Sequence, residues 1–192
     1  MKKIILGSLV ASSVLLANNS VQVNVNNDTL ELGGDIFLNR YYNVNNSSNY
    51  YLTARYLRTE AEKKHDDNQT LTSVGFKLVN PMTDNYGISL GLGIKTVYSS
   101  HNSESFFAMP LTLNGRIEFN EMLYFDTDLS YSPRVLSFMD GESYRDIQAR
   151  INYKVLADGY IYLGGRNIET EYENGAKVKF DTSAFVGFDI KF

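Results

Sequence analysis

The sequence of 192 residues contains no cysteine, no tryptophan and only three prolines. Without cysteine, neither disulfides nor thiolate metal sites can hold the fold. After residue 17, no stretch approaches the roughly 18 apolar residues of a membrane-spanning helix. Cationic excess is also missing, because the net charge is −4, and a nucleic-acid partner requires a basic surface. These absences exclude a disulfide scaffold, a helical membrane protein and a nucleic-acid-binding protein.

The first 17 residues have the pattern of a secretory signal peptide. Lys2 and Lys3 are cationic, residues 4–16 form a short apolar run, and Ala17 is a small residue suited to cleavage. The alternative, an N-terminal membrane anchor, is disfavoured because the apolar run stops there. We therefore predict a cleaved signal peptide over residues 1–17 and a single domain over residues 18–192, which no linker or low-complexity tract divides.

The rest of the chain is rich in alternating apolar and polar residues, the period of half-exposed β-strands. The alternation predicts strands at residues 29–42, 49–59, 70–79, 85–98, 107–119, 123–131, 144–155, 159–168 and 178–192. Most match the roughly 9 to 11 residues of a tilted membrane strand. The mean hydropathy of −0.25 is that of a soluble protein, as expected where a barrel presents apolar residues on one face only.

The predicted connections alternate between short turns and longer polar loops, the arrangement of an outer-membrane barrel. We predict an all-β fold, a transmembrane antiparallel up-and-down β-barrel. Nine strands would leave the chain ends on opposite sides, so Val21 to Val25 is predicted as a short first strand, giving ten. Eight is the alternative, with irregular N-terminal strands. A soluble sandwich is disfavoured, because the charged face of each strand fits the lumen of a membrane barrel, where it is kept away from hydrocarbon.

Aromatic residues support this location, with 14 Tyr and 11 Phe. Tyrosine suits the membrane interface, and we predict aromatic girdles that include Tyr56, Tyr98, Tyr124, Tyr131, Tyr144 and Tyr153. Phe192 closes the last predicted strand; by resemblance to outer-membrane proteins generally, it is the signal that the barrel-assembly machinery reads. In this phase Phe180, Val186, Phe188 and Ile190 face outward, and Lys179, Asp181 and Asp189 face the lumen.

Charged residues of both signs occupy the predicted inward face. The candidate network consists of Arg116, Glu118, Asp126, Asp128, Asp146, Arg150, Lys154 and Arg166. Other charged residues expected in the lumen are Glu31, Asp35, Arg55, Lys77 and Lys95. A selective pore favours a ring of one sign, whereas balanced charges in a narrow lumen pair with one another. We therefore predict a closed, charge-paired interior, with a small pore as the alternative.

The C-terminal half, about residues 86–192, resembles the YfaZ-type outer-membrane proteins. The short motifs that carry the resemblance are Tyr131-Ser132-Pro133, Leu136-Ser137, Ser143-Tyr144, Gly159-Tyr160, Arg166-Asn167 and Phe185-Val186-Gly187. The resemblance implies a Gram-negative outer-membrane barrel of unestablished activity. It adds no catalytic residues.

Two loops offer catalytic residue types. His65-Asp66-Asp67 superficially resembles the His and Asp pairs of omptin-type proteases, and His101-Asn102-Ser103 the His-x-Ser of lipid A deacylases. Both lie in predicted loops, where no rigid scaffold orients them. A lipid A modifying enzyme thus stays a distant alternative, and we predict no enzymatic activity, metal or cofactor.

A third loop, residues 132–141, carries apolar residues beside a cation. Arg134, Leu136, Phe138 and Met139 are candidates for contact with the outer leaflet or a partner, unless the loop folds over the barrel mouth. The expected partners are outer-membrane lipid and lipopolysaccharide, with the barrel-assembly machinery and periplasmic chaperones during biogenesis. A monomer is expected.

Overall fold

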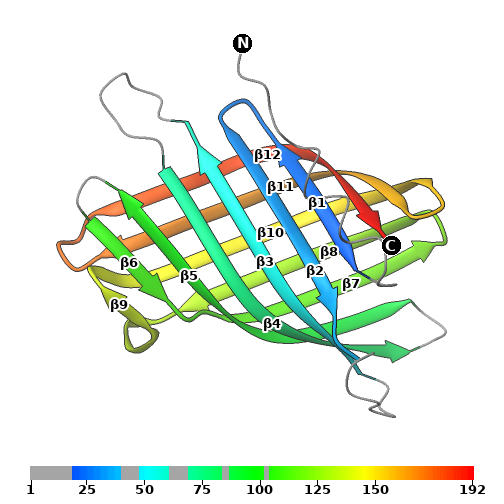
Figure 1. Cartoon of the computed structure of the whole chain (residues 1–192), viewed down its shortest axis with the longest axis horizontal. Helices are drawn as coiled ribbons and strands as arrows, with labels where there is room; N and C mark the ends of the chain where they lie inside the picture. Colours follow the sequence, from blue (N-terminus) through cyan, green and yellow to red (C-terminus); the bar gives the residue numbers. More distant parts are fainter. Residues whose placement is uncertain (1–18, 40–47, 61–68, 84–86, 102–103) are drawn as a thin grey trace.

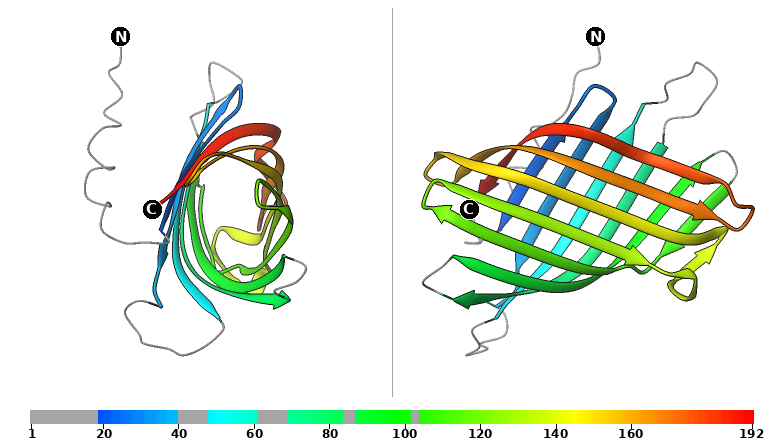
Figure 2. Two further views of the ribbon diagram at one scale, coloured as in Figure 1. Left: turned by 90° about the vertical axis from the view of Figure 1, so that its right-hand side faces the viewer. Right: turned by 180° about the vertical axis from the view of Figure 1, so that it is seen from behind.

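The computed structural model describes residues 19–39, 48–60, 69–83, 87–101 and 104–192, which form one antiparallel sheet. Its strands are β1 (Ser20–Val25), β2 (Thr29–Phe37), β3 (Asn49–Thr59), β4 (Gln69–Thr83), β5 (Ile88–His101), β6 (Glu104–Ala108), β7 (Leu111–Asn120), β8 (Leu123–Ser132), β9 (Ser137–Met139), β10 (Gly141–Leu156), β11 (Gly159–Tyr172) and β12 (Lys177–Lys191). Pairing of β1 with β12 and of β4 with β5 closes the sheet into a barrel (Figures 1 and 2).

The barrel has ten strands, because β6 and β7 are two parts of one strand and β9 is an accessory segment. The predicted short first strand is confirmed. Val21 pairs with Ile190 and Val25 with Val186, and backbone hydrogen bonds between Asn19 and Phe192 extend this ladder. The alternative of eight strands is therefore wrong, since β1 and β2 are both regular.

The strands point apolar residues outward and polar residues into the lumen. On β5, Leu90, Leu92 and Ile94 are exposed on the outer face, whereas Gly91 and Gly93 line the interior. Short turns at residues 121–122 and 157–158 lie at the same end as Asn19 and Phe192, which we assign to the periplasm by the barrel rule. The described part of the chain contains no helix that is long and apolar enough to cross a membrane.

A β-bulge in β12 changes the phase of the strand near its external end. Asp181 pairs with Ile168, but the next pair is Lys179 with Glu169, so one residue is inserted at Phe180. An extra residue reverses the faces of all residues beyond it. The predicted directions of Lys179 and Phe180 are therefore wrong: Lys179 is exposed, and Phe180 is buried inside the barrel.

Beyond this bulge, the polarity of the wall is inverted. The outward residues are now charged, and Arg145 pairs with Glu169 at 2.9 Å. The inward residues form an apolar cluster that fills the external end of the lumen. This cluster, called the apolar plug below, consists of Leu57, Leu71, Val97, Phe106, Ala108, Tyr144, Ile168, Tyr172 and Phe180. The external end is thus organised like a water-soluble barrel, with an apolar inside and a polar outside.

The wall has a local break beside Pro110, which lacks a backbone N–H group. The chain leaves β8 after Ser132, makes a short 3₁₀ helix at Arg134–Leu136, and returns as β9 beside β6. The backbone N–H of Met109 donates to the carbonyl oxygen of Leu136 at 2.8 Å. The predicted external loop is therefore partly built into the barrel wall.

Candidate functional site: the charged lumen

The structure brings six of the eight predicted lumen residues into polar contacts inside the barrel: Arg116, Asp126, Asp128, Asp146, Arg150 and Arg166. The other two, Glu118 and Lys154, form no ion pair with another described residue. Both occupy strand ends on the periplasmic side, where Glu118 is exposed.

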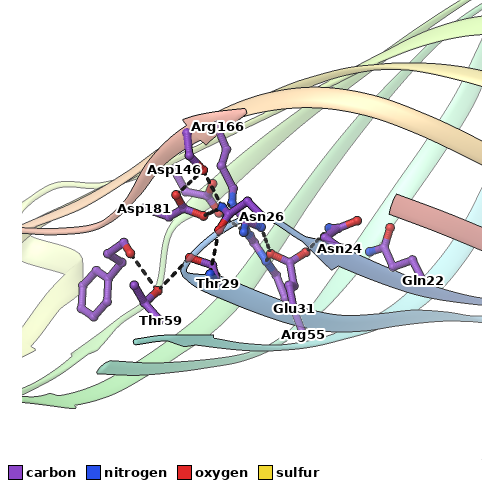
Figure 3. A network of polar contacts seen from close by, with 12 residues as sticks. Gln22, Asn24, Asn26, Thr29, Glu31, Arg55, Thr59, Asp146, Arg166 and Asp181 are labelled. Carbon is purple, nitrogen blue, oxygen red and sulfur yellow. Dashed lines mark hydrogen bonds and ion pairs between the residues drawn. The ribbon is translucent and has the colours of Figure 1, made fainter. Parts of the chain in front are cut away.

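The first group of contacts is a continuous chain of alternating charges across the lumen, and Figure 3 labels all of its members except Lys95. In order, it runs Asp181, Arg166, Glu31, Arg55, Asp146 and Lys95, and each residue comes from a different strand. We call it the lumen ion chain. The distances are 2.5 Å for Arg166 Nε to Asp181, 2.9 Å for Arg55 Nε to Glu31, 2.6 Å for Arg55 to Asp146 and 3.0 Å for Lys95 to Asp146; Arg166 also pairs with Glu31.

The lumen ion chain is electrically neutral, with three cations and three carboxylates. Its carboxylates receive further hydrogen bonds, because Asn24 donates to Glu31 at 2.8 Å and Tyr144 to Asp146 at 3.2 Å. Buried charges are tolerated only when they are paired and hydrogen-bonded. These contacts join strands on opposite sides of the barrel and lie directly beneath the apolar plug.

The second group lies nearer the periplasm and centres on Asp126. Arg116 approaches this carboxylate at 2.8 Å and Arg150 at 3.3 Å. Arg150 also donates to Gln22 at 2.7 Å, and its guanidinium lies 4.7 Å from the ring centre of Tyr162. The group therefore connects β7, β8 and β10 with β1.

Asp128 has no cation partner among the described residues and instead accepts hydrogen bonds from Asn114 at 2.5 Å and Ser130 at 3.2 Å. Lys77 and Asp35 form a separate pair at 2.7 Å. Most of the described lumen charges are thus paired, although some carboxylates are satisfied by neutral donors.

Residues of both groups line a cavity of about 330 Å³. We call it the lumen chamber. Its lining reaches from Glu31 and Arg55 of the ion chain to Ser20 and Lys191 at the periplasmic ends of β1 and β12, and it includes none of the residues of the apolar plug. The chamber is therefore blocked toward the outside and extends to the periplasmic mouth.

Several important lumen residues were not predicted. Tyr124 and Tyr144, which we expected in the membrane girdles, are buried inside the barrel. An aromatic ring suits either face of a strand, so composition alone does not reveal its direction. The alternation did indicate the direction of Tyr144, because this residue is two positions from Asp146 and so lies on the same face of the strand. The outward positions of Tyr98 and Tyr131 fit the girdle.

Gly187 gives room for the central polar contacts. A Cβ atom at this position would overlap the ring of Tyr162 and the side chain of Asn24, which themselves form a hydrogen bond. Gly187→Ala is expected to lower the free energy of unfolding by about 1–3 kcal/mol, the usual cost of overpacking. Urea unfolding in micelles measures this. Gly165→Ala is the control, because its Cβ would meet only the carbonyl oxygen of Ser183 at 3.9 Å; equal losses would contradict the prediction.

The predicted loop contacts have different surroundings. Arg134 is exposed and lies 3.5 Å from Glu173. Phe138 and Met139 belong to β9, and the rings of Phe138 and Phe107 lie 5.9 Å apart. The carbonyl of Leu136 is bound to Met109. Leu136, Phe138 and Met139 are thus part of the wall, while Arg134, Phe138 and Met139 keep exposed outer surface.

The structure does not describe all of the residues on which the enzymatic alternatives depend. Residues 65–67 and 102–103 lie outside the described residues, as do residues 1–17 of the predicted signal peptide. Within the described ranges, no group of three or more His, Cys, Asp or Glu side chains is placed to hold a metal ion.

The apolar outer face and the polar interior of the closed ring define an outer-membrane β-barrel protein. The family model described as YfaZ precursor matches residues 1–192, and the chain belongs to this family. Comparison with the curated proteins found no match.

The barrel is similar to several solved structures, two of which illustrate the likeness. One is OmpT (in-vitro folded), an outer membrane protein of Vibrio cholerae, with 9% identity and a TM-score of 0.42; the match covers 90% of this chain and 64% of that one. The other is the NanC porin, with 7% identity and a TM-score of 0.48, covering 92% of this chain and 100% of that one. At such identities the similarity concerns the fold alone.

Proposed function

We propose that the protein is a closed outer-membrane barrel with a structural or surface-contact role, and that it does not conduct. The observation that carries this proposal is the double closure of the lumen. The apolar plug fills the external end, and beneath it the lumen ion chain connects six strands through six buried or half-buried charges. An ion crossing the barrel would have to break buried pairs and then enter an apolar region, and both steps are costly.

Recording in planar lipid bilayers tests this closure. Purified protein is expected to give no steady conductance, with a porin inserted under the same conditions as the positive control. Steady, charge-selective conductance would contradict the proposal and favour the alternative, a small pore.

The surface-contact role includes lipid, lipopolysaccharide and, during biogenesis, the assembly machinery and periplasmic chaperones, with the barrel acting as a monomer. Its support is the exposed apolar surface of Val135, Phe138 and Met139 beside the cation Arg134. The proposal assigns no enzymatic activity. Identical lipid A mass spectra from cells with and without the protein would agree with that; a modified lipid A would contradict it.

A further inference from the structure

We propose that the lumen chamber is a binding site for a small organic anion that enters from the periplasm. This inference extends the proposed function, because a chamber closed on the outside serves binding and not transport. Its volume of about 330 Å³ lies at the lower end of the range of small-molecule sites, about 300–1,000 Å³. A solute with the dimensions of a sugar acid is therefore the appropriate class.

In three ion pairs of the lumen, the cation is more exposed than its carboxylate partner. The side chain of Arg55 is 12% exposed and that of its partner Glu31 is 1% exposed. Lys95 is 12% exposed and Asp146 1%. Arg116 is 32% exposed, whereas Asp126 is 14% exposed. In the Lys77–Asp35 pair the two side chains are similarly exposed, at 23% and 26%. The cations of the other three pairs are therefore the ones that offer more surface than their partners to a solute in the chamber.

Hydrogen-bonding capacity gives a second, independent argument. The ammonium group of Lys77 has three donors, and the hydrogen bond to Asp35 uses one. Lys191 lies above the rings of Tyr124 and Tyr160, at 5.4 and 4.6 Å from their centres, and makes no ion pair with a described carboxylate. A carboxylate-bearing solute would offer acceptor oxygens to these donors.

The position of these groups fits entry from the periplasm. Lys191 is the last residue of β12 and lines the chamber at its mouth, while Lys77 and Arg116 line it further inside. Asp35, Asp128 and Asp189 also line the chamber and oppose an anion, but Asp35 is paired with Lys77 and Asp189 is only 4% exposed. A ligand would therefore pass a cation at the mouth and then meet the exposed cations of the interior.

Isothermal titration calorimetry of the folded barrel in detergent micelles tests this site, with glucuronate as the probe and glucose as its uncharged match. We expect saturable binding of glucuronate and none of glucose. Arg116→Gln is expected to weaken glucuronate binding at least tenfold, the loss for about one charge-assisted hydrogen bond. Asp126 retains Arg150 in this variant. Arg145→Gln, on the external outer face, is the matched control and should bind as the wild type does.

Lys191→Gln provides a second variant if Arg116→Gln fails to fold, which the heat-dependent mobility of folded barrels in gels reveals. The proposal is overturned if glucuronate does not bind, if glucose binds equally well, or if both lumen variants retain wild-type affinity. The outcome is separable from the conductance test. Glucuronate binding with steady conductance would refute closure and keep the site, whereas neither binding nor conductance would refute the site and keep closure.

Discussion

Replacing Arg166 by methionine is expected to lower the free energy of unfolding by about 3–5 kcal/mol, the cost of leaving a buried charge without its partner. Arg166 is fully buried and connects Glu31 with Asp181, which lie on β2 and β12. Methionine fills a similar volume but leaves both carboxylates with fewer partners. Equilibrium urea unfolding in micelles, followed by far-ultraviolet circular dichroism, measures the change.

The matched control is Arg145→Met. Arg145 also pairs with a carboxylate, Glu169, but on the solvent-exposed outer face, where an ion pair contributes at most about 1 kcal/mol. An equal loss of unfolding free energy in the two variants would show that the buried lumen ion chain stabilises the barrel no more than an exposed ion pair does.

Replacing Leu163 by arginine is expected to lower the free energy of unfolding by about 2–4 kcal/mol, the cost of a cation at the centre of the lipid face. Leu163 is 59% exposed on the outer face. It lies midway between Ile161 and Gly165 in the apolar part of β11, and its partner on β12 is Val186. Reversible unfolding from lipid vesicles provides the measurement, because detergent adapts more easily to a charge.

Asn167→Arg serves as the control for this substitution. It lies on the same face of the same strand, beyond the apolar band and opposite Thr182. Near the interface the cost falls to about 0–1 kcal/mol. Equal losses in the two variants would place the membrane boundary elsewhere on β11.

The alternating pattern predicted the barrel well because lipid and lumen impose opposite polarity on neighbouring residues. The strand at Val21 to Val25 is an example, since parity alone required it and the ladder with β12 confirms it. The prediction failed where a strand leaves the membrane. There Phe180 faces inward, and nothing in the alternation marks the inserted residue.

Pairing inside the lumen was predictable in kind but not in detail. Balanced charges indicated ion pairs, yet the partners Glu31 and Arg166 are 135 residues apart, and alternation says nothing about which strands face each other across a ring. Pro110, within a predicted continuous strand, was a readable signal of the break between β6 and β7, because proline cannot donate to the ladder.

The inverted polarity beyond the β-bulge has a consequence for insertion into the membrane. The apolar plug unites residues from seven strands, so it is complete only when the external ends of all seven strands are in place. At the external end, the hydrophobic effect favours burial of the plug, as in a soluble protein. Withdrawal of the strands toward the periplasm would expose these apolar side chains again. Burial of the plug is therefore expected to oppose withdrawal of the external strand ends from the outer side of the membrane.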